Sequence, residues 1–170
     1  MVRHNFGATE KLAFVHYLSE AESASTKNVL MSAEALSKEF ETFLFSSVSH
    51  DLFSFYDISE RIKFSRNAFG FSTKIFQLFD RSLFFIVTFF RIWLSDIKKI
   101  YTRDIFFLSI LSLIPKKNFK LIYEAHNPYG STSKFPEFLE RRAVKYADHS
   151  FCVSEGVHED IKKWSESSSI

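Results

Sequence analysis

Two stretches decide the fold: KKIYTRD at residues 98–104 and FKLIYEAH at residues 119–126. Each contains a short run that favours a β-strand, IYT at 100–102 and LIY at 121–123, and ends in charged or ionisable side chains. In an open sheet of parallel strands, ligands bind outside the carboxyl ends of the strands. We therefore expect Arg103, Glu124 and His126 to lie on that edge of a sheet, where a ligand would meet them.

Strands and helices also alternate along the rest of the chain. The chain opens as strand, helix, strand, because a helix with Val29, Ala33 and Leu36 on one face separates two apolar runs. Residues 50–71 show no clean pattern, and we leave them open. The predicted strands span residues 11–18, 41–48, 98–102, 119–124 and 150–153, with short extended pieces at 52–56 and 62–64. The first predicted helix begins after residue 26, and the other predicted helices span 73–94, 105–114, 136–146 and 155–164.

This alternation predicts an α/β fold, a Rossmann-like three-layer sandwich with a mostly parallel sheet in a single domain. The runs at 121–123 and 151–153 are continuously apolar, which is typical of strands buried on both faces. In the helix over 73–94, apolar residues recur at helical spacing, so we expect them to form its buried face. They are Ile75, Phe76, Phe79, Leu83, Ile86, Val87 and Phe90.

Composition and charge exclude several classes of protein. The formal net charge is only +2, from 22 basic and 20 acidic residues, so we expect no nucleic-acid partner. The single cysteine, Cys152, excludes an internal disulfide and fits a reducing compartment. Residues 1–10 carry no secretory signal, which predicts a cytoplasmic protein. The 22 phenylalanines leave three explanations open: an aromatic core, a membrane-facing surface or an A+T-rich genome.

Four motifs in order resemble the N-terminal domain of family 4 glycosyltransferases. They are YTRD at 101–104, LIYEAH at 121–126, ERRA at 140–143, and AD at 147–148 leading into FCVSEG at 151–156. The resemblance is strongest over residues 98–163 and looser over 11–48. It implies one half of a GT-B fold, with this domain over residues 1–164 and a frayed tail over 165–170. The family's donor-binding domain, with its paired glutamates, has no counterpart here, so we expect the chain to be incomplete as an enzyme.

The same resemblance implies an activity and a set of site residues. The activity is transfer of a sugar from a nucleotide-sugar donor, which is a substrate, to a glycan or lipid-linked acceptor, with no cofactor and no metal. The family pattern implies His126 as the catalytic residue, since an imidazole can accept a hydroxyl proton near neutral pH. It implies acceptor-binding roles for Arg103, Asp104, Glu124 and Asn127 and leaves the donor-binding residues unknown. A donor-binding partner chain is one way to complete the enzyme.

Four of these residues also have a purely structural explanation. Arg103 and Asp104 would serve as a helix N-cap with a neighbouring charge, and Glu124 as a buried carboxylate that ties loops together. His126 would be a hydrogen-bonded loop residue. The segment 19–25 contains no glycine, unlike the turn after the first strand in many relatives, so a donor-phosphate contact there is in doubt.

Three further segments are expected to be structural. We expect residues 140–142 to form a solvated helix face, with contact to an anionic acceptor or lipid headgroup as the alternative. Ser154 and Gly156 are expected to form a turn. Cys152 lies in an apolar run and is expected to be an inert thiol.

A second function from another class is a non-catalytic α/β module. In that hypothesis the apolar helix over 73–94 docks a partner protein or the inner face of a membrane, with Phe84 and Phe85 in the contact. A nicotinamide-dependent enzyme is disfavoured, because no Gly-x-Gly-x-x-Gly follows any predicted strand.

Overall fold

Every strand of the sheet runs in the same direction. The computed structural model describes residues 10–17, 23–47, 51–58, 61–66, 74–114, 119–126 and 134–166. The strands are β1 (Lys11–His16), β2 (Glu41–Ser46), β3 (Lys63–Arg66), β4 (Lys99–Thr102), β5 (Lys120–Ala125) and β6 (His149–Cys152). The helices are α1 (Ala24–Ser37), α2 (Asp51–Phe55), α3 (Lys74–Trp93), α4 (Ile105–Leu111), α5 (Lys134–Tyr146) and α6 (Glu155–Glu166).

The order of the strands is that of a doubly wound sheet. It runs β3-β2-β1-β4-β5-β6, and all five pairings are parallel. Strand order reverses between β1 and β4, where Val15 pairs with Thr102. Such a switch point opens a crevice at the carboxyl ends of the strands, because the two following segments leave toward opposite faces. The predicted α/β, Rossmann-like fold with a parallel sheet is confirmed.

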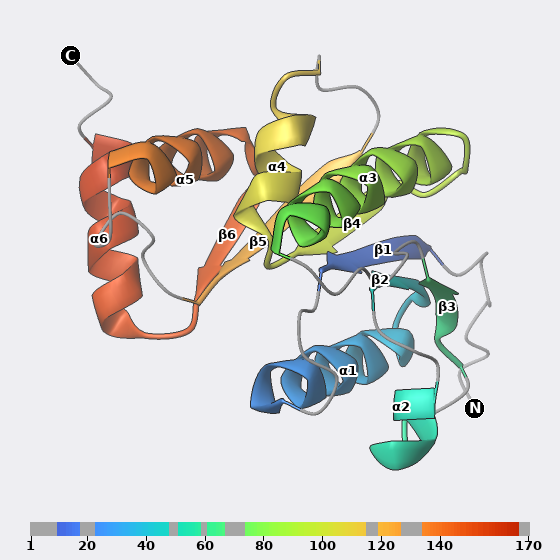
Figure 1. The fold of residues 1–170 in the computed structure, drawn as a ribbon. Coiled ribbons are helices and arrows are strands. Elements are labelled where there is room, and N and C mark those ends of the chain that lie inside the picture. Colours follow the sequence, from blue (N-terminus) through green and yellow to red (C-terminus); the bar gives the residue numbers. More distant parts are fainter. Residues whose placement is uncertain are drawn as a thin grey trace.

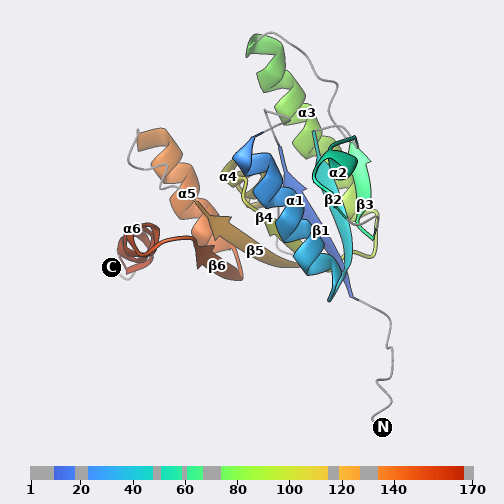
Figure 2. The same cartoon turned by 90° about the horizontal axis from the view of Figure 1, so that it is seen from below.

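Helices cover both faces of the sheet and produce two apolar clusters. β1 alternates between them: Leu12 and Phe14 join the smaller cluster, while Ala13 and Val15 join the larger one. The smaller cluster includes side chains of α1 and α2, and the larger one includes those of α3, α4, α5 and α6. Figure 1 shows α1 with α2 on one side of the sheet and α3 with α4 on the other. Figure 2 shows α6 beyond β6, at the edge of the sheet.

The segment left open by the sequence contains a helix and a strand. The extended piece expected at 52–56 is wrong, because α2 forms there, whereas β3 confirms the piece near 62–64. Leu52 and Phe53 are adjacent and both buried in the same cluster. A helical turn can place two neighbours toward one core, while a strand would send them to opposite faces.

The last strand is not buried as its apolar sequence suggested. In β6, Phe151 is 57% exposed, and Val153 just after it is 49% exposed. β6 is the end strand of the sheet, so it has a neighbour on one side only. The last helix, predicted over 155–164, continues to Glu166.

The buried face of α3 also differs from the expected one. Phe79, Ile86 and Phe90 are 60%, 45% and 55% exposed, whereas Phe84 and Phe85 are fully buried. α3 is apolar on most of its circumference, so helical spacing alone does not select the face that packs. Ile75 and Phe76 lie outside the residues whose side chains are described. The hypothesis that Phe84 and Phe85 dock a partner is wrong, because both belong to the core.

Residues 140–142 do not form a solvated face. Glu140 is fully buried and accepts a hydrogen bond of 3.2 Å from the Tyr123 hydroxyl. Arg142 donates from Nε to Ser112 Oγ at 2.7 Å and from Nη2 to the Ser112 carbonyl at 3.0 Å. This charged stretch therefore ties α5 to β5 and to the end of α4, because its polar groups have partners within the fold.

Two phenylalanines on α3 should differ sharply in their effect on stability. Truncation of a buried phenylalanine leaves a cavity, so Phe84→Ala should lower the free energy of unfolding by about 3–5 kcal/mol. Phe90→Ala, at an exposed position of the same helix, should change it by less than about 1 kcal/mol. Urea unfolding followed by circular dichroism measures both. Equal losses in the two variants would contradict the assigned face.

Candidate functional site

The candidate site lies at the carboxyl ends of β1, β4 and β5, next to the switch point. Buried Thr102 joins two of these strand ends, since its hydroxyl donates to the Val15 carbonyl at 2.7 Å. The same oxygen accepts the Asp104 amide at 3.0 Å. This pair of bonds fixes the turn between β4 and α4, which carries Arg103.

Arg103 and Glu124 form a two-point ion pair across this edge. Arg103 Nε donates to Glu124 Oε2 at 2.9 Å, and Nη2 lies 2.8 Å from Oε1. Nη2 also donates to Ser32 Oγ on α1 at 2.9 Å. The two side chains are only 8% and 11% exposed. The guanidinium fork therefore fixes the β5 carboxylate and links it to α1, a geometry that a lysine could not reproduce.

Glu124 in turn holds His126. The His126 Nε2 lies 2.7 Å from Glu124 Oε1, and the Tyr101 hydroxyl donates to Oε2. Burial acts to raise the pKa of Glu124, but the hydrogen bonds from Tyr101 and Arg103 and the Arg103 charge hold it below its ordinary value. Glu124 is thus an ionised carboxylate and can only accept hydrogen bonds.

The ionised carboxylate decides the tautomer of His126. In the neutral ring, Nε2 must carry the hydrogen that faces Glu124, which leaves the lone pair on Nδ1. The His126 side chain is 40% exposed, far more than that of its partner. His126 therefore combines a fixed orientation with access to the surface, the two properties that a general base requires.

His16, at the end of β1, belongs to this site although sequence reasoning did not single it out. Burial, then the charges of Arg103 and Arg81, lower the pKa of His16 to about 3. The residue keeps some exposed surface, yet its Nδ1 is buried and has no hydrogen-bond partner within the described part of the chain. The available signal is its position directly after the apolar run at 12–15, although the predicted strand over 11–18 extends past it.

Asp104 interacts with α4 and α3, and not with Glu124 or His126. It is 4% exposed and caps α4, with Oδ1 accepting the Phe106 amide at 2.9 Å. Its Oδ2 lies 2.8 Å from Arg81 Nη2 on α3. Burial raises the pKa of Asp104, against the lowering effect of Arg81. The N-cap explanation accounts for Asp104, and its contact with an acceptor stays a prediction.

The structure thus brings together three of the five predicted site residues, namely Arg103, Glu124 and His126. Asn127 lies outside the described residues, and so does most of the glycine-free loop after β1. Ser154 Oγ accepts the Val157 amide at 3.4 Å at the start of α6, so its role is structural, while Gly156 lies inside the helix instead of in a turn. Burial raises the pKa of the Cys152 thiol, which fits an unreactive cysteine.

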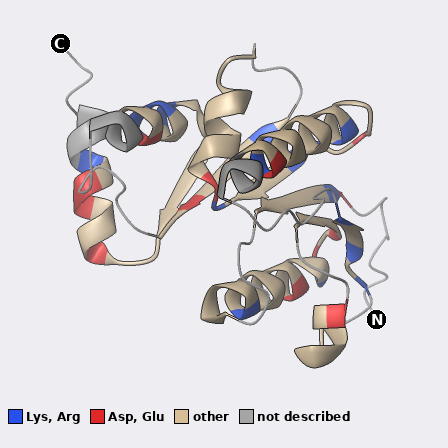
Figure 3. Ribbon diagram, in the orientation of Figure 1, with Lys and Arg blue, Asp and Glu red and all other residues tan. Residues whose placement is uncertain are grey.

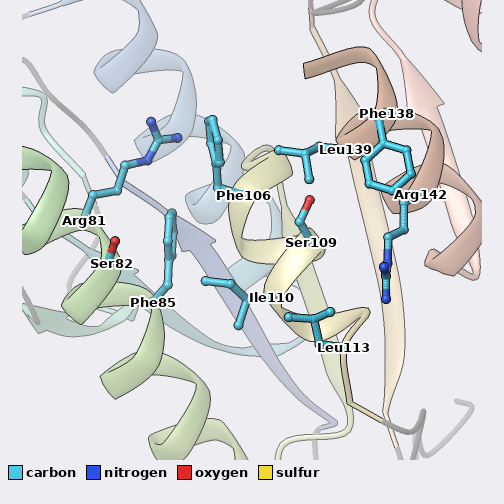
Figure 4. Close-up of a pocket in the computed structure, with 10 residues that line it drawn as sticks. All are labelled: Arg81, Ser82, Phe85, Phe106, Ser109, Ile110, Leu113, Phe138, Leu139 and Arg142. Atoms are coloured by element: carbon cyan, nitrogen blue, oxygen red, sulfur yellow. The ribbon is translucent and has the colours of Figure 1, made fainter. Parts of the chain in front are cut away.

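Two cavities lie apart from this cluster. One is an apolar groove of about 370 Å³ between α3, α4 and α5, shown in Figure 4. Its floor, α4, carries no charged residue, as Figure 3 shows. The other, of about 720 Å³, lies at the amino ends of the strands and is lined by charged residues such as Lys11 and Asp96, which pair at 2.6 Å. His126 lines neither cavity. The candidate site is therefore defined by the side chains at the strand ends and not by a cavity.

Within the described residues, no group of three or more His, Cys, Asp or Glu side chains could hold a metal ion. The helices of that part of the chain include none that is long and apolar enough to cross a bilayer.

The fold is that of one Rossmann-like half of a GT-B architecture, and two solved structures are similar to it. The lipopolysaccharide outer core galactosyltransferase WaaB, in its apo form, matches with a TM-score of 0.55 and 18% identity over 91% of this chain. A Listeria monocytogenes protein described as a UDP-N-acetylglucosamine 2-epimerase matches with a TM-score of 0.59 and 11% identity over 94% of this chain. This chain covers only 42% and 43% of those two proteins.

At these identities the likeness establishes the fold, and the predicted GT-B half is confirmed at that level. No family model matches the sequence. No curated protein matches it either. The boundaries at residues 164 and 165 stay a prediction.

The low pKa of His16 makes the fold sensitive to acid. The unfolded chain binds a proton at His16 below about pH 6.5 while the folded chain does not, so stability falls as the pH falls toward 3. At about pH 5 this should cost about 2 kcal/mol relative to about pH 7.5. His16→Gln should remove that part of the loss, whereas exposed His158→Gln should behave as the wild type. Urea unfolding at both pH values measures it, and an equal loss in all three proteins would refute a buried neutral His16.

Proposed function

We propose that this chain is the acceptor-side half of a glycosyltransferase and that His126 is its general base. The proposal rests on the hydrogen bonds that connect Arg103 to Glu124 and Glu124 to His126 at the carboxyl ends of the strands. In a doubly wound fold this edge, beside the switch point, is where ligands bind. The likeness in fold to a galactosyltransferase supports sugar transfer, and the fold alone would also suit other nucleotide-sugar enzymes.

The proposed chemistry uses the lone pair on His126 Nδ1. As the acceptor hydroxyl oxygen bonds to the anomeric carbon of the donor, its proton passes to Nδ1. The bond from that carbon to the donor phosphate breaks, and the nucleoside diphosphate leaves with the electron pair. Glu124 stabilises the imidazolium that forms, and Arg103 keeps Glu124 ionised and oriented.

The neutral ring of His16 supports an acceptor with hydroxyl groups. His16 keeps some exposed surface at this edge of the sheet, and its uncharged ring suits a hydroxyl group better than an anion. A hydroxyl can donate to or accept from imidazole, whichever tautomer His16 adopts. We propose a glycan or the sugar part of a lipid-linked molecule as the acceptor. A second Rossmann-like domain, in the same polypeptide or in a partner chain, would bind the nucleotide sugar.

The test is binding of soluble glycans, measured by amide NMR of the labelled chain. A panel of mono- and disaccharides and their phosphates should contain ligands that shift the amides of Arg103 and His126. His126→Ala removes a hydrogen-bonding group, so it should weaken that binding by about 10-fold. His158→Ala, at an exposed position on α6, is the matched control and should leave the affinity unchanged. The proposal fails if no glycan shifts these amides, or if His126→Ala binds as the wild type does.

A further inference from the structure

The helices on one face of the sheet carry most of the large apolar side chains that are exposed in the described part of the chain. Of eleven such side chains, seven lie on or just after α3, α4 and α5, namely Phe79, Ile86, Phe90, Trp93, Leu94, Leu113 and Phe138. The other four are scattered over α1, α2 and the region of β6. Single exposed apolar residues are common, but a cluster of them marks an interaction surface.

Five of the seven form a stripe along α3, which we call the α3 stripe. Phe79, Ile86, Phe90 and Trp93 follow one another at intervals of seven, four and three residues, so they lie along one face of the helix. Leu94, which is 83% exposed, ends the stripe. Its length is about 22 Å at the rise of an α-helix. The opposite face of α3 is packed into the core, so the stripe is a second apolar face that points outward.

The apolar surface continues from the α3 stripe toward α5. Ser82 lies one helical turn from both Phe79 and Ile86, and it lines the groove between α3, α4 and α5 that Figure 4 shows. Leu113 and Phe138 line the same groove and are 71% and 58% exposed. The stripe and the mouth of the groove therefore form one apolar surface.

The accessible charges of these helices have a single sign. Where the structure describes them, the acidic side chains of α3, of α5 and of the α4 N-cap are all buried: Asp80, Glu140 and Asp104. The charged side chains that keep exposed surface are all basic: Arg81, Arg91, Arg141, Arg142 and Lys145. Asp96, two residues after the stripe, is paired with Lys11 at 2.6 Å. By contrast, Glu155 and Glu159 are exposed on α6, where Figure 3 shows acidic residues.

One of the exposed basic residues lies beside the apolar surface. Lys145 follows Phe138 by seven residues, which is two helical turns, so the two side chains share a face of α5. Both are exposed. The apolar surface thus carries a positive charge on its α5 side.

An apolar stripe with basic neighbours distinguishes among possible partners. A twofold contact between two copies would bring the same basic side chains together, and like charges repel. A nucleic acid would pair with the basic groups but leave the stripe in water. A protein would need an acidic groove that matches a convex helix, whereas a fluid bilayer adapts its shape. A bilayer with anionic lipids accepts both the apolar side chains and the positive charges, and tryptophan favours its interface.

We propose that this protein binds the surface of an anionic bilayer through α3. The α3 stripe enters the boundary between headgroups and acyl chains, with Leu113 and Phe138 beside it, and Lys145 lies near the headgroups. The surface contains none of the residues Arg103, Glu124 and His126, so the proposal does not depend on the proposed transferase function.

The probe is a vesicle of equal parts phosphatidylglycerol and phosphatidylcholine, with binding measured by co-sedimentation. The protein should bind saturably, and at least about 10-fold more weakly to vesicles of phosphatidylcholine alone. Added salt should weaken binding to the anionic vesicles, because it screens the charges.

Trp93 reports on the depth of the contact. The sequence has two tryptophans, so Trp164→Phe leaves Trp93 as the only one. Its fluorescence emission should move to shorter wavelength when anionic vesicles are added, and lipids brominated on their acyl chains should quench it. Binding with no change in the emission of Trp93 would overturn the proposal, since the contact would then be formed by other residues.

Three variants and a matched control complete the test. Phe90→Glu and Leu94→Glu change exposed positions, so the fold should persist by circular dichroism, and each should weaken vesicle binding at least about 10-fold. Lys145→Gln should weaken binding to the anionic vesicles about 5-fold. Met31→Glu adds the same charge on α1, at a position that is 52% exposed, and should change binding by less than about 2-fold.

Three results would overturn the proposal: no saturable binding to anionic vesicles, equal binding to phosphatidylcholine alone, or wild-type binding by both stripe variants. Self-association that Phe90→Glu abolishes, in a protein that does not bind vesicles, would also overturn it and would assign the stripe to a contact between two copies.

Discussion

The ion pair between Arg103 and Glu124 is the interaction on which the candidate site depends. It joins the turn after β4 to the end of β5, and through Ser32 it reaches α1 on one face of the sheet. Both charges are buried, so removal of either partner alone would leave an uncompensated charge and cost about 3–5 kcal/mol. The pair is therefore more than a surface contact. It fixes where the carboxylate lies and keeps it ionised, and the orientation of His126 follows from that.

Burial is the main cause of the low pKa of His16, and the charges of Arg103 and Arg81 add to it, whereas Glu124 acts in the opposite direction. His16 therefore stays neutral at pH values where most histidines would take up a proton. The site thus holds one neutral ring at β1 and one carboxylate-bound ring after β5. Both lie at the edge of the sheet where strand order reverses, which is why residues far apart in sequence can act on one ligand.

Much of this could be predicted from the sequence, and the failures have a common physical cause. A charged side chain is costly to bury in the middle of a strand that is packed on both faces, so the charged residues that follow an apolar run are expected near a strand end, where Arg103, Glu124 and His126 lie. Burial was predicted poorly wherever it depends on distant neighbours. The face of α3 depends on which helices pack against it, and the exposure of Phe151 depends on β6 being the end strand. Glu140 is buried because Tyr123 provides a partner from another element.

The central claim is that ionised Glu124 fixes the ring of His126 for chemistry at Nδ1. The most direct measurement is the ¹⁵N NMR spectrum of the His126 ring, recorded at a pH where the ring is neutral, in the wild type and in Glu124→Gln. The account predicts a hydrogen on Nε2 and a lone pair on Nδ1 in the wild type, and a mixture of tautomers in the variant, since a side-chain amide can donate as well as accept. A wild-type ring that carries its hydrogen on Nδ1, or that shows the same mixture as the variant, would contradict it.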